Sequence, residues 1–333
     1  MKGSELNVVL VYDDPAVWPR AGDLPEDFGA EYEDRRTIDA LLAAIAAAGH
    51  DATGLALDGD FAQTIAALRP DLVFNIAEGI RGSARESLVP AWLEQLDIPY
   101  TGSDGLALAI SLDKALTKTL AVSAGVRTPP FRRIRDEAEL SDVDFPFPLF
   151  VKPNAEGSSM GIGGTSLVET PEALAEQVCH VLRAYHQDCL VEVFVPGREF
   201  CVGILGNDSP QLLPIAEVRT EGAFYAYEDK SRHHKELLCP ADVSEDTAEQ
   251  MRVMALTAFE ALRCRDLARV DFKLDETGRP MFLEINPLPG LSPFYSIFPH
   301  QGSVAGIGYE ELIGRIMGAA LERTGRREER TAT

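Results

Sequence analysis

The first third of the chain alternates short apolar runs with segments of helical pattern. Residues 7–12 form a nearly continuous apolar run, which is typical of a buried strand. A polar loop with Pro and Gly follows over residues 13–29, a length that can mark a functional loop or a simple insertion. An Ala-rich helix is then expected from Glu31 to Ala48, where Gly49 stops it. Further strands are expected at 52–57, 71–75 and 98–103 and further helices at 61–68 and 86–96. This βαβαβ alternation predicts a parallel sheet.

Two further units follow along the chain. The second is expected to contain helices at 105–110, 113–124 and 171–186, strands at 148–153 and 190–195, and a loop at 154–164. The third is expected to contain strands near 199–205 and 211–218, a helix at 244–262, a hairpin, and a helix at 309–323. We therefore expect an α/β protein with an N-terminal domain at 1–103 and two subdomains at 104–195 and 196–333.

Composition narrows the class of protein. Across 333 residues, 45% are hydrophobic and 25% are charged, as in soluble globular proteins. The net charge of -22 argues against nucleic acid or an anionic membrane as a partner. Five scattered cysteines without a C-x-x-C pair suit free thiols in the cytoplasm, and neither a signal peptide nor a run of about 18 apolar residues is visible.

A C-terminal hairpin carries a set of oxygen ligands. The runs at 267–274 and 281–290 read as two strands joined by a turn-rich spacer. Pairing across that turn could place Asp271, Glu284 and Asn286 on one face, because side chains two residues apart share a face of a strand. Two carboxylates and an amide oxygen suit Mg²⁺, which also takes phosphate and water oxygens. The alternative is a solvated hairpin with outward acidic residues.

Two other stretches offer phosphate and nucleoside contacts. The loop at 156–164 is rich in Gly and Ser and lies between strands, so its backbone N–H groups could surround phosphates, or it could be an ordinary hairpin loop. Lys152 before it and Lys114 on an earlier helix could supply positive charge, although either alone could be a surface residue. The strand at 191–195 could present backbone groups to a purine, with Glu199 near a ribose.

Together these stretches resemble one family. In chain order they are Ile98-Pro-Tyr-Thr-Gly-Ser103, Asp113-Lys114, Lys152, Glu156-Gly-Ser-Ser159, Glu192, Glu199, Phe224–Lys230, Arg269-Val-Asp271 and Glu284-Ile-Asn-Pro-Leu-Pro-Gly290. This combination resembles the ATP-grasp fold and, more narrowly, the D-alanine–D-alanine ligase family, as a divergent member. The resemblance spans residues 31–290. It implies that the two later subdomains enclose a nucleotide.

The resemblance assigns a role to each matching residue. It implies ATP contacts from Lys114, Lys152, Ser158, Ser159, Met160, Glu192, Val193, Val195, Glu199 and Lys230, with the last near the γ-phosphate. It implies that Asp271, Glu284 and Asn286 bind two Mg²⁺ ions, for which Mn²⁺ could substitute. Arg269, Lys230, Ser158 and the Gly290 backbone would serve catalysis, and Glu31, Ser158, Ser231, Arg269, Gly290 and Ser296 would contact the substrates.

The implied reaction forms an amide in two steps. ATP phosphorylates the carboxylate of a first amino-acid-like substrate, and the amine of a second attacks the acyl phosphate. Arg269 and Gly290 would stabilise the charge that develops on oxygen. Members of the family are commonly dimers, so a homodimer is expected.

Three departures from the family pattern affect the substrates. The usual Gly-Gly-x-Ser turn after the first strand is replaced by the 13–29 segment, although Glu31 lies where it could hold an ammonium group or simply begin a helix. Ser231 stands where a tyrosine is usual and is followed by Arg232, His233 and His234, which could alter the second substrate or be a solvated loop tip. Pro287-Leu-Pro289 replaces small polar residues, and Ser296 only approximately matches the usual carboxylate-binding serine.

Three other functions stay open from the sequence. The same chemistry could act on other amino acids, on hydroxy acids, or on one molecule that closes into a ring. An ATP-binding module without ligase activity is less favoured, because the phosphate lysines, metal carboxylates and Arg269 are all present. A Rossmann dehydrogenase is weaker still, since no G-x-G-x-x-G follows the first strand.

Overall fold

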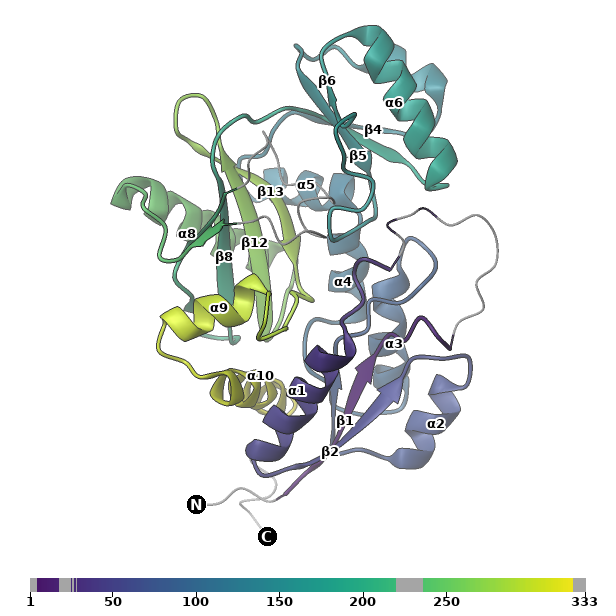
Figure 1. The fold of residues 1–333 in the computed structure, drawn as a ribbon, viewed down its shortest axis with the longest axis vertical. Coiled ribbons are helices and arrows are strands. Elements are labelled where there is room, and N and C mark those ends of the chain that lie inside the picture. Colours follow the sequence, from purple (N-terminus) through teal and green to yellow (C-terminus); the bar gives the residue numbers. More distant parts are fainter. Residues whose placement is uncertain (1–4, 18–24, 26, 28, 220–235, 326–333) are drawn as a thin grey trace.

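The computed structural model describes residues 5–17, 25, 27, 29–219 and 236–325. Three sheets follow one another along the long axis of the molecule, each with helices packed against it (Figure 1). The predicted Lys230 and Ser231, with the rest of the 224–235 stretch, lie outside the described residues. No helix in the described ranges has the length and hydrophobicity needed to cross a membrane.

The N-terminal sheet is parallel, as predicted. Its order is β2-β1-β3, and β1 pairs in parallel with both neighbours. The predicted strand at 98–103 is reduced to a single parallel bridge between Tyr100 and Val73. The elements of this part are β1 (Asn7–Tyr12), α1 (Arg35–Ala47), β2 (Asp51–Ala56), α2 (Phe61–Leu68), β3 (Leu72–Asn75), the 3-10 turn η1 (Arg85–Ser87) and α3 (Leu88–Gln95).

The first helix begins at Arg35, so the expected start at Glu31 is wrong. Asp34 adopts an extended backbone, and its carboxylate accepts a hydrogen bond from the Thr37 N–H at 2.8 Å, which fixes the N-cap. Residues 31–34 are consequently free of the helix, and their side chains reach the cavity described below.

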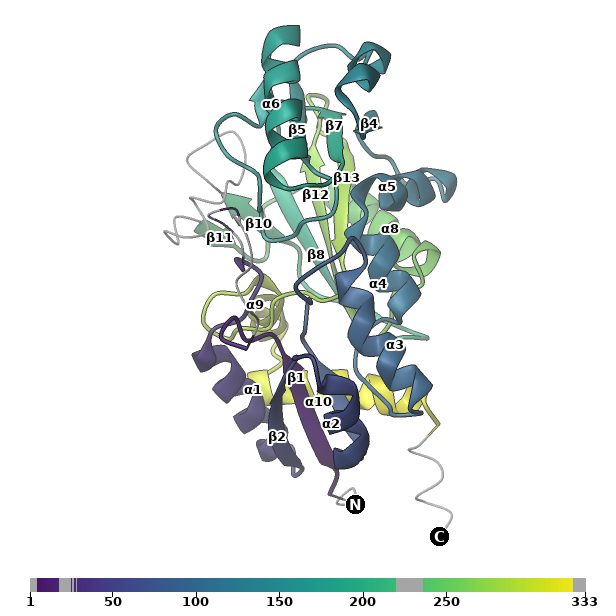
Figure 2. The same ribbon diagram turned by 90° about the vertical axis from the view of Figure 1, so that its right-hand side faces the viewer.

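The central sheet is antiparallel and has the order β4-β7-β5-β6. Helix α6 lies along one face of it (Figures 1 and 2), and Val178 and Val181 fill the space between them. Strand β4 was not predicted, because its two arginines interrupt the apolar pattern. The elements here are α4 (Gly105–Leu112), α5 (Lys114–Ser123), β4 (Phe131–Ile134), η2 (Glu137–Asp142), β5 (Leu149–Pro153), β6 (Leu167–Val168), α6 (Pro171–Ala184) and β7 (Cys189–Val193).

The third sheet is also antiparallel, with the order β11-β10-β8-β12-β13 and with β9 paired to β8. The single strand expected at 211–218 is wrong, because the chain around Pro214 leaves the ladder between β9 and β10. The elements are β8 (Glu199–Leu205), β9 (Gln211–Leu212), β10 (Ala216–Arg219), β11 (Glu236–Leu238), α8 (Glu245–Ala261), β12 (Leu267–Leu274), β13 (Pro280–Asn286), α9 (Ile297–Val304) and α10 (Tyr309–Arg323).

Helix α10 connects the N-terminal part of the chain to the third sheet, since its buried cluster includes Leu205 of β8 and Leu267 of β12. Ile313 and Ile316 on α10 share one buried cluster with Leu10 of β1 and with Leu41 and Ile45 of α1. Figure 1 shows α10 lying beside α1 at the junction of the first and third sheets. This packing ties the N-terminal sheet to the C-terminal part of the chain.

Candidate active site

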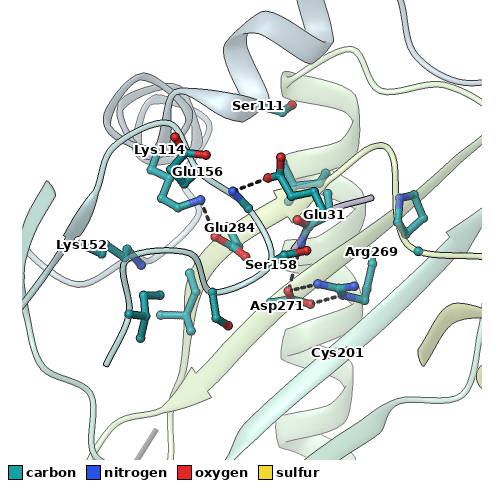
Figure 3. Close-up of a pocket in the computed structure, with 18 of the residues that line it drawn as sticks. Glu31, Ser111, Lys114, Lys152, Glu156, Ser158, Cys201, Arg269, Asp271 and Glu284 are labelled. Carbon is teal, nitrogen blue, oxygen red and sulfur yellow. Dashed lines mark hydrogen bonds and ion pairs between the residues drawn. The ribbon is translucent and has the colours of Figure 1, made fainter. Parts of the chain in front are cut away.

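A cavity of about 510 Å³ is lined by the central and third sheets and by segments of the N-terminal part outside its strands. It is lined by strands β5, β7, β8, β12 and β13, by the 156–162 loop, and by residues 30–34 before α1. The structure brings together the predicted residues Glu31, Lys114, Lys152, Ser158, Ser159, Glu192, Val193, Val195, Glu199, Arg269, Asp271, Glu284, Asn286, Gly290 and Ser296. Met160 does not line this cavity, and its side chain is buried. Figure 3 shows the central side chains.

One buried carboxylate in the cavity wall holds two lysines. Glu192 on β7 lies 2.7 Å from the Lys152 ammonium and 2.9 Å from the Lys118 ammonium. Burial raises the pKa of Glu192, but the two lysines outweigh it and lower the pKa to about 2. The carboxylate therefore stays charged and fixes Lys152 at the cavity wall.

Lys118 supports the site through Glu192 although it does not itself line the cavity, and the sequence did not predict it. It is fully buried, and its ammonium also donates to the Thr128 hydroxyl at 2.7 Å. Burial lowers its pKa to about 8, against the opposing attraction of Glu192. The available signal was its spacing, since Lys118 follows Lys114 by one helical turn on α5.

The hairpin β12–β13 forms the oxygen-rich wall. Its register sets Asp271 opposite Glu284 and Arg269 opposite Asn286, with an irregularity after Asp271. Asp271 accepts two hydrogen bonds from Arg269, at 2.8 and 2.7 Å, and one from the Asn286 amide at 3.0 Å. Glu284 forms an ion pair with Lys114 at 2.9 Å. The prediction that these oxygens face one side of the hairpin is consistent with this geometry.

The donor chemistry of this wall fits a hard divalent cation. In proteins Mg²⁺ commonly takes one or two carboxylates and fills its other positions with phosphate and water oxygens. Asp271 and Glu284 supply two carboxylates, and the Asn286 amide supplies a third oxygen. Among the residues that the structure describes, no group of three or more His, Cys, Asp or Glu side chains could hold a metal ion.

Both carboxylate oxygens of Glu31 interact with other residues. One of its oxygens accepts from the Gly157 N–H at 2.6 Å, and the other pairs with the Arg85 guanidinium at 2.8 Å. Arg85 also pairs with Glu156 at 3.0 Å and donates to the Ala155 carbonyl at 2.9 Å. Arg85 was not predicted as a site residue. The structure shows that it joins the segment before α1 to the glycine-rich loop.

A second carboxylate, Glu33, lies beside Gly290. Tyr295 donates to Glu33 at 2.6 Å. A Cβ added to Gly290 would lie 2.8 Å from the Ser296 hydroxyl and 3.3 Å from a Glu33 oxygen, so only glycine fits without displacement. Ser296 in turn accepts from the Ser292 N–H at 3.1 Å. This end of the cavity therefore combines the Glu33 carboxylate, the Tyr295 and Ser296 hydroxyls and the backbone of Gly290.

Burial raises the pKa values of other carboxyl groups that line the cavity. Burial raises the pKa of Glu199 to about 7, and repulsion from Asp271 and Glu284 adds to the effect while Lys273 opposes it. Burial also raises the pKa of Glu78 and of Glu86. Carboxyls with raised pKa values in a cavity are characteristic of functional sites.

Comparison with known proteins agrees with this geometry. Residues 120–318 match a family described as the D-ala D-ala ligase C-terminus. The uncharacterized protein y4sG of Sinorhizobium fredii is 36% identical over 301 residues, covering 86% of this chain and 88% of that protein. A D-alanine–D-alanine ligase of Gluconobacter oxydans is 35% identical over 295 residues, covering 86% of this chain and 93% of that protein.

Solved structures show the same architecture. A D-alanine–D-alanine ligase from Bacillus anthracis, complexed with ATP, superposes with a TM-score of 0.76 at 22% identity, covering 97% of this chain and 99% of that one. The VanG D-Ala:D-Ser ligase of Enterococcus faecalis superposes with a TM-score of 0.75 at 19% identity. Fold and cavity thus define an ATP-grasp enzyme.

The chain belongs to the D-alanine–D-alanine ligase family, which confirms the resemblance found in the sequence. It is accordingly an ATP-dependent ligase that forms carbon–nitrogen bonds, and a non-catalytic ATP-binding module is not favoured.

Proposed function

We propose that this ligase joins two small amino acids, with D-alanine as both the first and the second substrate in the default case. The observation that supports this most directly is the single cavity that combines two lysines, an oxygen-rich wall and the Gly290 corner. These parts correspond to a nucleotide, its metal ions and a small carboxylate substrate. Several relatives are D-alanine–D-alanine ligases, and one solved structure with this fold is a D-Ala:D-Ser ligase.

In the first step, an oxygen of the first substrate's carboxylate attacks the γ-phosphorus of ATP, and the bond to the bridging oxygen breaks. ADP leaves with the bonding electrons, and an acyl phosphate remains. We assign Lys114 and Lys152 to the α- and β-phosphates, Lys230 to the γ-phosphate, and Ser158, Ser159 and Met160 to the loop above them. Lysines here act as compact charges that offset the charge of the phosphates.

Adenosine would occupy the part of the cavity beside β7 and β8. We assign Glu192 and the backbone at Val193 and Val195 to the adenine and Glu199 to the ribose hydroxyls, which a carboxylate accepts well. Two Mg²⁺ ions, or Mn²⁺ in their place, would be held by Asp271, Glu284 and Asn286. When bound, such ions neutralise charge on the phosphates.

In the second step, the neutral amine of the second substrate attacks the acyl carbon, phosphate leaves, and the amine loses a proton. Arg269 and the Gly290 N–H would stabilise the oxyanion of the tetrahedral intermediate. We place the first substrate's ammonium group at Glu31, with Glu33 as a second carboxylate near it, because both line the cavity and Glu33 lies at Gly290. Ser231 and Ser296 would contact the second substrate, and a homodimer is the proposed assembly.

The test is ADP release with ATP and Mg²⁺ across D-alanine alone and a panel of paired amino and hydroxy acids. D-alanine alone should give turnover, with amide product equal to ADP. Glu284→Ala should abolish ADP formation, whereas Glu276→Ala, an exposed glutamate in the turn of the same hairpin, should not. Turnover with another pair and none with D-alanine would overturn the substrate assignment. Near wild-type turnover in Glu284→Ala would overturn the metal assignment.

A further inference from the structure

The glycine-rich loop between β5 and β6 is fastened to the N-terminal part of the chain at two points. At the first, the Gly157 N–H donates to Glu31 at 2.6 Å. At the second, the Gly161 N–H donates to a carboxylate oxygen of Asp27, also at 2.6 Å. Asp27 belongs to the segment that stands in place of the family's usual Gly-Gly-x-Ser turn. The segment that replaces the family's usual turn therefore contacts, through Asp27, the loop that the proposed function places over the phosphates.

Tyr185 completes the second attachment. Its hydroxyl donates to both oxygens of Asp27, at 2.9 and 3.1 Å, from the C-cap position of α6. Asp27 is buried, with only 7% of its surface exposed. Burial and the nearby Asp27 charge raise the pKa of Tyr185, so its hydroxyl remains a proton donor at neutral pH. The Asp27 carboxylate thus receives hydrogen bonds from the loop and from α6.

The backbone of the loop needs this support. Ser158 and Ser159 both adopt left-handed conformations, with φ of 51° and 60°. Such conformations are unfavourable for residues with a side chain, and they persist only where the surroundings hold them. Gly161 has φ of 72°, and a Cβ there would lie 2.4 Å from Pro153 Cγ. The two attachments flank the strained serines, at Gly157 before them and at Gly161 after them.

We propose that Asp27 and Tyr185 are positioning residues of the ligase reaction, which hold the 157–161 loop closed over the nucleotide phosphates. This inference rests on the proposed function in one respect, namely that the loop covers the phosphates of ATP. Neither side chain lines the cavity, so both act through Gly161 and the loop backbone. A closed loop keeps water from the acyl phosphate, which otherwise hydrolyses before the amine attacks.

Tyr185→Phe is the main test, because it removes one hydroxyl and keeps the ring against the loop. Asp27→Ala removes the shared acceptor. Tyr100→Phe is the matched control, since the Tyr100 hydroxyl donates to the Glu94 carboxylate at 2.7 Å and lies outside the cavity. Titration calorimetry measures the affinity for MgATP. Hydrogen exchange measures protection of the peptides that cover residues 154–166, and paired assays measure amide formed per ADP released.

Both test variants should bind MgATP about three- to tenfold more weakly, because a smaller fraction of the loop is closed. Their 154–166 peptides should exchange faster, and less amide should form per ADP, while Tyr100→Phe matches the wild type in all three. A Tyr185→Phe protein with wild-type affinity, exchange and coupling would overturn the inference. If the Asp27→Ala variant does not fold, the measurements on Tyr185→Phe alone test the inference.

Failure of the proposed function would look different. If the wild-type protein binds MgATP but forms no amide from any substrate pair, the proposed reaction is wrong. The affinity and exchange measurements would still show whether Asp27 and Tyr185 hold the loop.

Discussion

Replacing Glu199 with glutamine should make the stability of this protein less dependent on pH. Burial raises the pKa of Glu199 from its ordinary 4.5 to about 7. The folded protein therefore keeps a proton that the unfolded chain releases, so the stability this group contributes at low pH is lost as the pH rises from 4.5 to about 7. At about 1.4 kcal/mol per pH unit, the loss is about 3 kcal/mol as an upper limit, because the side chain retains some contact with water.

Urea unfolding followed by circular dichroism measures this effect at about pH 4.5 and about pH 8. Relative to wild type, Glu199→Gln should gain about 1 to 3 kcal/mol between the two pH values, since every other titrating group is shared. The variant should also bind ATP more weakly at the higher pH, because an amide offers the ribose one acceptor oxygen where a carboxylate offers two. A stability difference that does not change with pH, or that changes in the opposite direction, would refute the reasoning.

Three other substitutions test separate parts of the structure. Lys118→Met leaves buried Glu192 with Lys152 and should cost about 1 to 3 kcal/mol in urea unfolding; stability equal to wild type would contradict the pairing. Gly157→Ala places a Cβ 2.3 Å from a Glu31 oxygen, so the loop must shift, and the KM for ATP should rise while the urea midpoint changes little. Ile313→Ala empties a fully buried position and should cost about 2 to 5 kcal/mol with an unchanged KM for ATP.

Local patterns in the sequence predicted much of the site. The hairpin at 267–290 combines β-favouring runs with a turn, and the register of a short hairpin follows from its turn. The sequence predicted that Asp271, Glu284 and Asn286 share a face, but not their pairing. The register that continues from the turn would set Asp271 opposite Leu283, and the irregularity after Asp271 sets it opposite Glu284 instead. Lys152 could be placed beside the glycine-rich loop, because it lies at the end of an apolar strand.

The partners of these residues could not be predicted, because they are distant in sequence. Arg85 pairs with Glu31 and Glu156, which lie 54 and 71 residues away, and no local pattern links them. Glu33 and Tyr295 are 262 residues apart. Lys118 reads as an ordinary helix lysine until the fold surrounds it. The contacts of Lys230 and Ser231 lie outside the described residues, and their assigned roles stay predictions.

The packing of α10 has a consequence for the order in which the chain can fold during synthesis. The cluster around Leu10, Leu41 and Ile45 is completed by Ile313 and Ile316, which the ribosome adds some 270 residues after α1. The cluster of the central sheet, by contrast, draws only on residues between 134 and 193. Domains generally fold as units once their residues have emerged. One face of the N-terminal sheet draws its core from residues 9–100 and can close early. The opposite face, around Leu10, waits for α10, which is made after all the core residues of the central sheet.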